Sequence, residues 1–130
     1  MKIKTSELTG AALDWAVAKC EGHTPFMSEH RIVEGAKSVL VGNRLVWEPS
    51  TSWKDGGPII ERENISFRQY VRDGVGGKWY AKVCRESGTQ IYWKGWGAQP
   101  STGDTPLVAA MRCYCASKLG EEVEIPEELK

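Results

Sequence analysis

The chain has 130 residues, of which 41% are hydrophobic and 26% are charged, as is typical of one folded globular domain. Lysine plus arginine equals aspartate plus glutamate, at 17 each. Proteins that bind extended nucleic acid usually have an excess of basic residues, and this chain has none. No apolar run approaches the roughly 20 residues that span a bilayer, and the N-terminus has no secretory apolar core. We therefore expect a single domain over residues 1–130, in the cytoplasm, with its four cysteines reduced.

The first predicted element is a helix over residues 6–20, where small and apolar residues share one broad stripe. Thr5 or Ser6 would cap this helix, and Gly22 would end it. A loop is expected over residues 23–37, which contain a proline and a glycine that interrupt regular structure.

A hairpin is predicted next, from strands at residues 38–41 and 44–47 joined by Gly42-Asn43 in a tight turn. In this two-residue register Leu40 and Trp47 would share one face with Leu45. The opposite face would then carry Val39, Val41 and Val46.

The segment at residues 48–58 includes the stretch STSWKDGGP and is predicted to be a loop, because it combines hydroxyls, two glycines and a proline. A short extended stretch would follow at 59–63. Residues 65–71 alternate apolar and polar side chains, which predicts a strand with Ile65, Phe67 and Val71 on one face. After a glycine-rich turn at 73–77, residues 78–84 and 90–93 would form another hairpin.

A second irregular loop, at residues 95–104, precedes a helix that Asp104 or Thr105 would cap and that Pro106 would begin. Gly120 would end this helix, and one short edge strand would precede an acidic tail at about 121–130. The order of elements predicts an α+β fold: an antiparallel sheet of about four to six strands packed with an N-terminal and a C-terminal helix. The apolar stripe of the second helix consists of Leu107, Ala110, Met111, Tyr114 and Cys115.

The two irregular loops hold the residues with the strongest functional pattern. Glycine backbone and a helix N-terminus bind phosphate groups, an indole ring stacks on planar groups or anchors a partner protein, and a guanidinium binds phosphate. For either loop alone the simpler interpretation is a turn, a cap or a surface ion pair. Only convergence of the two loops would make a site. The candidate ligand-binding residues are Ser50, Thr51, Ser52, Trp53, Gly56, Gly57, Arg62, Trp96, Ser101, Thr102, Thr105 and Arg112.

Metal binding and catalysis are only weakly indicated. Cys20, His23 and His30 supply three ligands within eleven residues, whereas a structural zinc site generally uses four with paired spacing. Glu61 and Glu63 would share a strand face, for which a solvated strand edge is the simpler explanation. No nucleophile elbow, phosphate-loop lysine or HExxH motif is present. We therefore expect no catalytic residues, no metal and no cofactor.

Three stretches of the chain are distinctive in order and spacing: KTSELTGAALDWAVAKCEG at residues 4–22, PSTSWKDGGPIIERE at 49–63, and GDTPLVAAMRCYCASKLGEEVEIPEEL at 103–129. Together they resemble the NinX-like family of small proteins from tailed bacteriophages. Residues 65–97 depart more from that family. The resemblance implies a phage accessory protein made in the cytoplasm of an infected bacterium, and it implies no particular activity.

The leading hypothesis is a non-enzymatic protein that binds a small anionic, nucleotide-like ligand and so sequesters a host defence signal. The amides of Gly56, Gly57 and Thr105 would face phosphate beside the hydroxyls of the two loops, Trp53 would stack, and Arg62 or Arg112 would counter charge. By analogy with other phage sponges, such a protein would be a homo-oligomer.

The alternative is a protein-interaction module that inhibits or redirects a host factor. It would use Trp53 and Trp96 as anchors and the acidic tail for steering. A small enzyme acting on nucleotides ranks third, and neither an extended nucleic acid nor a membrane is expected as a partner.

Overall fold

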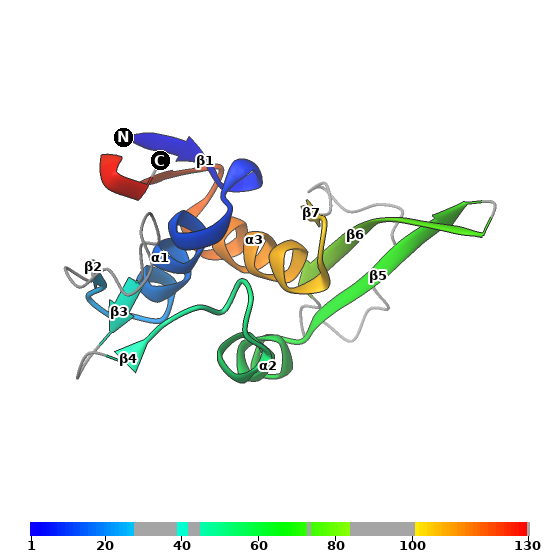
Figure 1. The fold of residues 1–130 in the computed structure, drawn as a ribbon, viewed down its shortest axis with the longest axis horizontal. Coiled ribbons are helices and arrows are strands. Elements are labelled where there is room, and N and C mark those ends of the chain that lie inside the picture. Colours follow the sequence, from blue (N-terminus) through cyan, green and yellow to red (C-terminus); the bar gives the residue numbers. More distant parts are fainter. Residues whose placement is uncertain (28–38, 42–44, 73, 84–100, 130) are drawn as a thin grey trace, which may run out of the picture.

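The computed structural model describes residues 1–27, 39–41, 45–72, 74–83 and 101–129 (Figure 1). The predicted strand at 90–93 and the residues His30 and Trp96 lie outside this part of the chain. The helices are α1 (Gly10–Cys20), α2 (Trp53–Arg62) and α3 (Pro106–Leu119), with short 3-10 turns at Thr5–Glu7 and Glu127–Leu129. The strands are β1 (Lys2–Lys4), β2 (Phe26–Met27), β3 (Val39–Val41), β4 (Leu45–Val46), β5 (Ile65–Arg72), β6 (Val75–Val83), β7 (Ser101–Gly103) and β8 (Glu122–Glu124).

The described strands form three small antiparallel sheets, so the predicted α+β class is confirmed. One sheet pairs β1 with β8, the second has the order β2-β3-β4, and the third has the order β5-β6-β7. The N-terminal strand β1 was not predicted, because its three residues are too few to show an alternating pattern.

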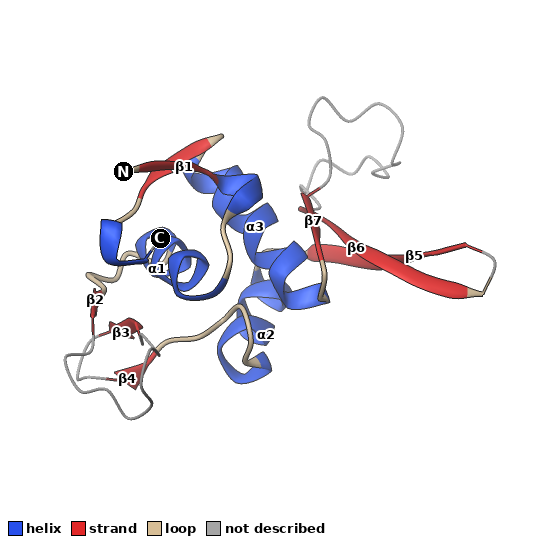
Figure 2. Cartoon of the chain, turned by 45° about the horizontal axis from the view of Figure 1, so that its top comes forward, coloured by secondary structure: helices blue, strands red, loops and turns tan. Residues whose placement is uncertain are grey.

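Helix α3 lies at the centre of the fold, between α1 on one side and the β5-β6-β7 sheet on the other (Figure 2). Its predicted apolar stripe is buried, and Ala109 and Cys113 outside that stripe are buried as well. Small side chains allow neighbouring elements to approach the helix on several sides, so α3 has no wide polar face. One core cluster joins its residues to those of α1, α2, β5, β6 and the C-terminal segment.

The predicted cap of α3 is confirmed at Thr105, whose hydroxyl oxygen accepts a hydrogen bond from the Val108 N–H at 3.1 Å. We expect Thr105→Ala to lower the free energy of unfolding by about 1 kcal/mol, measured by urea denaturation. Thr9 is the matched control: it occupies the N-cap position of α1 but makes no side-chain capping bond. Equal losses from Thr9→Ala and Thr105→Ala would contradict the assignment of the Thr105 cap.

Helix α1 begins at Gly10, later than predicted, because Thr5 belongs to a separate 3-10 turn. The Thr5 hydroxyl donates to the Gly120 carbonyl oxygen at 3.0 Å, so this residue secures the end of α3 and does not cap α1. The other end agrees with the prediction, since Gly22 has a φ of 79° just after the helix.

The largest difference from the predicted elements is α2, because its residues 53–62 were expected to form the second part of a loop at 48–58 and most of an extended stretch at 59–63. Residues 48–52 are irregular, as predicted. Its sequence contains Gly56-Gly57-Pro58, which all disfavour the interior of a helix. Burial outweighs those local preferences: Gly56 and Ile59 face the core, and Ile60 packs against it. Glu61 and Glu63 therefore share no strand face.

The hairpin of β5 and β6 extends away from the rest of the molecule (Figure 1). Strand β6 begins at Val75, inside the predicted glycine-rich turn. The register shifts between Gln69 and Val71, where β6 has one residue more than β5, because Gln69 pairs with Trp79 and Val71 pairs with Gly76. Val71, at the far end of β5, is 57% exposed, whereas Ile65 is buried. That Val71 shares a face with Ile65 and Phe67 stays a prediction.

The predicted pairing of β3 with β4 is confirmed, but its register differs by one residue. Leu40 pairs with Val46, and the Trp47 N–H donates to the Val39 carbonyl oxygen at 2.9 Å. Three residues, and not two, separate the paired ends of the strands. A slip of one residue exchanges the two faces of a strand, which is why Leu40 and Trp47 do not share a face as predicted.

The acidic C-terminal segment is packed against the fold. Strand β8 pairs with β1, Thr5 N–H donates to the Glu121 carbonyl oxygen at 2.8 Å, and Ile125 and Leu129 are buried in the core. The glutamates between these anchors are exposed, so their negative side chains project from an ordered backbone.

Candidate functional site

The first of the two predicted polar segments packs directly against the helix that follows the second. A methyl group added at Gly56 would lie 2.6 Å from the Pro49 carbonyl oxygen and 2.7 Å from Cδ2 of Leu107, in the first turn of α3. The two segments can pack this closely because Gly56 has no side chain, and protein atoms fill the space between them at this point. The ligand-binding role of the two segments stays a prediction.

Several of the polar groups proposed for an anion are engaged within the protein. The Ser50 N–H donates to Asp14, and the Gly56 N–H donates to the Ser52 carbonyl oxygen at 2.9 Å. Arg112 donates through Nε to the Leu8 carbonyl oxygen at 2.7 Å, and through a terminal nitrogen to the Thr102 carbonyl oxygen at 2.8 Å.

Arg62, at the end of α2, is also engaged. Its guanidinium contacts Glu21 at 2.6 Å and Glu63 at 3.3 Å, and it donates to the Tyr114 hydroxyl at 3.3 Å. Such an arginine would have to exchange its carboxylate partners for phosphate, at a cost that an unpaired arginine would not incur.

Among the predicted residues that the structure describes, Trp53 is the one large hydrophobic side chain that is exposed, at 52%. Its ring centroid lies 6.0 Å from that of Phe67, which in turn lies 5.9 Å from that of Trp79. Phe67 and Trp79 pack against the core, so the row extends from the sheet to the surface at the start of α2. We call these three side chains the aromatic row.

Thr51 and Ser52 precede α2, and Gly57 lies within it. Ser101 and Thr102 lie in β7, and Thr105 caps α3. Thr51 is exposed, Ser52 occupies the N-cap position of α2, and Gly57 has open space at its Cβ position. The two neighbouring glycines, which the sequence pattern treated as one unit, therefore have different surroundings. Gly56 is packed against other protein atoms, whereas Gly57 has open space at its Cβ position.

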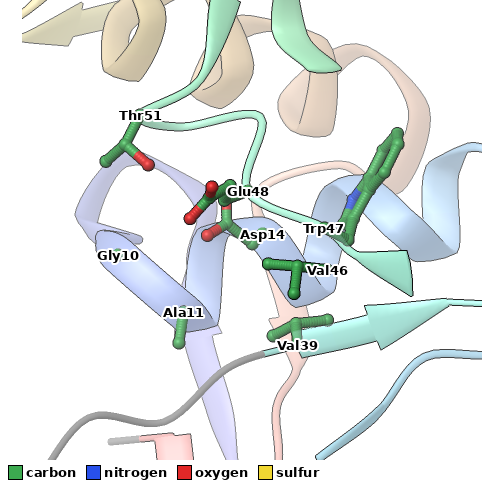
Figure 3. A pocket seen from close by; sticks show the side chains of 8 residues that line it. All are labelled: Gly10, Ala11, Asp14, Val39, Val46, Trp47, Glu48 and Thr51. Carbon is green, nitrogen blue, oxygen red and sulfur yellow. The ribbon is translucent and has the colours of Figure 1, made fainter. Parts of the chain in front are cut away.

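A cavity of about 190 Å³ lies between the start of α1, the β3–β4 pair and the turn before α2 (Figure 3). Apolar side chains form one part of its wall, and Asp14, Glu48 and Thr51 supply oxygen atoms to the other part. The residues that line it are Gly10, Ala11, Asp14, Val39, Val46, Trp47, Glu48 and Thr51. Of these, only Thr51 belongs to the predicted set.

Asp14 is the most unusual group of this cavity, because it is a carboxyl with only 6% of its surface exposed. Burial raises its pKa to about 6, and the negative charges of Glu48 and Asp55 act in the same direction. The Ser50 N–H, which donates to Oδ1 at 2.8 Å, partly opposes this rise. Asp14 lies outside the apolar stripe predicted for this helix, so the sequence pattern did not identify this group.

The carboxyl groups make the cavity unsuitable for a phosphate, which they would repel, and better matched to a hydrogen-bond donor or a cation. The Trp47 indole Nε1 nearby is buried without a hydrogen-bond partner among the described residues. The anionic ligand of the leading hypothesis therefore finds no support from this cavity.

The fold and these surfaces define a small α+β domain. The family described as "Bacteriophage P22, NinX" matches residues 4–118. This match includes residues 65–97, which were expected to depart more from the family. The chain belongs to this bacteriophage family. A search among curated proteins found no match. In the described residues, no helix has both the length and the apolar character needed to cross a membrane.

Proposed function

We propose that this phage protein acts by binding and not by catalysis, and that it is a protein-interaction module directed at a host factor in the infected bacterium's cytoplasm. The observation that carries the proposal is the exposed indole of Trp53 at the end of the aromatic row. Tryptophan is enriched among the residues that dominate binding energy, especially where its surroundings are rigid.

Two further features support a protein partner. Val46 is 52% exposed, and the described glutamates of the C-terminal segment present negative charge on an ordered surface. Charge of this kind speeds encounter with a basic partner, while an apolar anchor slows dissociation.

A small nucleotide-like ligand, sequestered as a host defence signal, remains the second candidate function. The observation that favours it is again Trp53, whose ring could stack on a base beside the exposed Thr51 and Lys54. Against it stands the internal engagement of Arg62 and Arg112. Homo-oligomer formation belongs to this second proposal.

The deciding experiment compares the wild-type protein with Trp53→Ala and with Val71→Ser as a matched control. Val71 is equally exposed but lies towards the far end of the hairpin. Host proteins retained by the wild type are identified by mass spectrometry, purified and titrated by calorimetry. We expect Trp53→Ala to weaken the affinity by about 30-fold, and Val71→Ser to leave it unchanged.

The same three proteins are screened by thermal shift against cyclic and linear nucleotides. Stabilisation of the wild type, lost in Trp53→Ala, would favour the nucleotide ligand over the host protein. Equal affinity of Trp53→Ala and wild type for the purified host protein would overturn the assignment of Trp53 as anchor.

A further inference from the structure

The cavity between the start of α1, the β3–β4 pair and the turn before α2 has buried and exposed lining residues. Asp14 and Val39 form its inner part, with 6% and 2% of their surfaces exposed. Val46, Glu48 and Thr51 are exposed and form its rim (Figure 3). A group that enters past this rim approaches the Asp14 carboxyl and loses much of its contact with water.

Negative charge gathers at this cavity. The pKa of Asp14 is about 6, so its carboxyl is mostly ionised at neutral pH. Glu48 lines the same cavity, and the Asp55 carboxylate lies close by, where it accepts the Glu48 N–H at 3.1 Å. Among the described residues, no lysine, arginine or histidine forms an ion pair with these three carboxyls. Because buried charges are ordinarily paired, this arrangement favours a cationic ligand.

The hydrogen bond to Asp14 does not account for its charge. The Ser50 N–H donates to Oδ1 at 2.8 Å and so fixes the orientation of the carboxyl. An asparagine would accept the same hydrogen bond without the cost of burying a charge. A charge that costs stability in this way is typical of a binding site, where it acts on a ligand.

The walls of the cavity indicate which kind of cation it suits. In the described residues, no three side chains of histidine, cysteine, aspartate or glutamate are arranged to hold a metal ion together. Ala11, Val39, Val46 and Trp47 form an apolar side of the cavity, against which a hydrocarbon chain gains free energy on burial. Lysine and arginine side chains combine such a chain with a charged head group.

We propose that this cavity binds an organic cation, an ammonium or guanidinium group on an aliphatic stem, which a lysine or arginine side chain of the protein partner supplies. The stem packs against the apolar wall, and the head group binds the carboxyls of Asp14 and Glu48. The source of the cation rests on the proposed function, whereas the chemistry of the cavity does not. The exposed glutamates of the C-terminal segment attract the same basic partner at longer range.

The first experiment tests the cavity alone, with the full-length protein labelled with nitrogen-15. It is titrated with n-butylammonium and n-propylguanidinium chloride, which reproduce the side chains of lysine and arginine. The signals of the Ser50 backbone N–H and the Trp47 indole N–H report on the polar and apolar sides of the cavity. We expect both signals to shift and saturate with at least one cation. Sodium chloride at equal ionic strength and uncharged n-butanol should produce no such saturation.

Three variants separate charge from volume in the same titration, after circular dichroism has shown that each is folded. Asp14→Asn keeps an acceptor for the Ser50 N–H and should lower the affinity for the cation by about 10-fold or more. Ala11→Leu keeps every charge but fills the cavity, and should lower the affinity as well. Glu61→Gln removes one negative charge from α2 outside the cavity and should leave the affinity unchanged.

Failure of the wild type to show saturable shifts, or equal affinity of Asp14→Asn and wild type, would overturn the cation site whatever the host factor proves to be. The second experiment uses the purified host protein, for which Asp14→Asn should weaken the affinity by about 10-fold. A host protein that depends on Trp53 but binds Asp14→Asn as tightly as wild type would overturn the partner's side chain as the source. Cation binding without any retained host protein would refute the proposed function and identify a free amine as the ligand.

Discussion

Asp14→Asn is expected to stabilise the protein at neutral pH. The Asp14 carboxyl has a pKa of about 6 in the folded chain against an ordinary value of 3.8, because the charged form is buried. At about pH 7.5 the ionised carboxyl therefore lowers the free energy of unfolding by about 2 to 3 kcal/mol. Asparagine carries no charge, and its side-chain oxygen can still accept the Ser50 N–H.

The effect must depend on pH in a defined direction. Since the folded pKa lies above the unfolded one, the folded state binds more protons between about pH 4 and pH 6. The contribution of Asp14 to stability is complete below the unfolded pKa and is lost as the pH rises through about 6. The advantage of Asp14→Asn should therefore be largest near pH 7.5 and close to zero near pH 4.

Urea denaturation of the wild type and Asp14→Asn across this range measures the difference directly. Glu48→Gln is a graded control, because Glu48 is only a secondary cause of the raised pKa and its removal should give a smaller gain. A wild-type minus variant difference that is the same at both ends of the range would show that Asp14 titrates normally.

The neighbouring glycines Gly56 and Gly57 should respond to the same substitution in opposite directions. Alanine at Gly56 would meet the Pro49 carbonyl oxygen at 2.6 Å and Cδ2 of Leu107 at 2.7 Å. The backbone oxygen cannot move without shifting the turn before α2, so we expect Gly56→Ala to lower the free energy of unfolding by about 2 to 3 kcal/mol.

Gly57→Ala meets no atom within 4 Å, and it replaces a poor helix former with the best one. We expect it to raise the free energy of unfolding by about 0.5 to 1 kcal/mol, measured by the same urea denaturation. Destabilisation by both substitutions would argue that residues 53–62 do not form a helix. Stabilisation by both would contradict the close contact of α2 with α3.

Local chemistry allowed much of the fold to be predicted, and its failures have physical reasons. The cap at Thr105, the end at Gly120 and the alternation from Ile65 to Phe67 are short-range signals, and each is confirmed. Helix α2 was missed because Gly-Gly-Pro is a strong local signal for a turn. What overrides it is burial against Leu107, a residue about 50 positions away along the chain.

The site was harder to predict than the elements. Trp53 was selected because an indole among polar and glycine neighbours is unusual, and the structure places it on the surface. Arg112 was selected for its guanidinium and Ser50 for its hydroxyl, and both groups donate to backbone carbonyl oxygens within the fold. The cavity at Asp14 depends on the distance between α1 and the β3–β4 pair, which no pattern within either segment records.

The central position of α3 has a consequence for how the chain acquires its structure during synthesis. Residues 106–119 leave the ribosome after α1 and the β5–β6 hairpin, yet both of these elements pack against them. Until then the apolar side chains of the earlier elements have little to cover them, which favours chaperone binding or aggregation of nascent chains. Translation that stalls before residue 106 should therefore leave a protease-sensitive product with little cooperative structure.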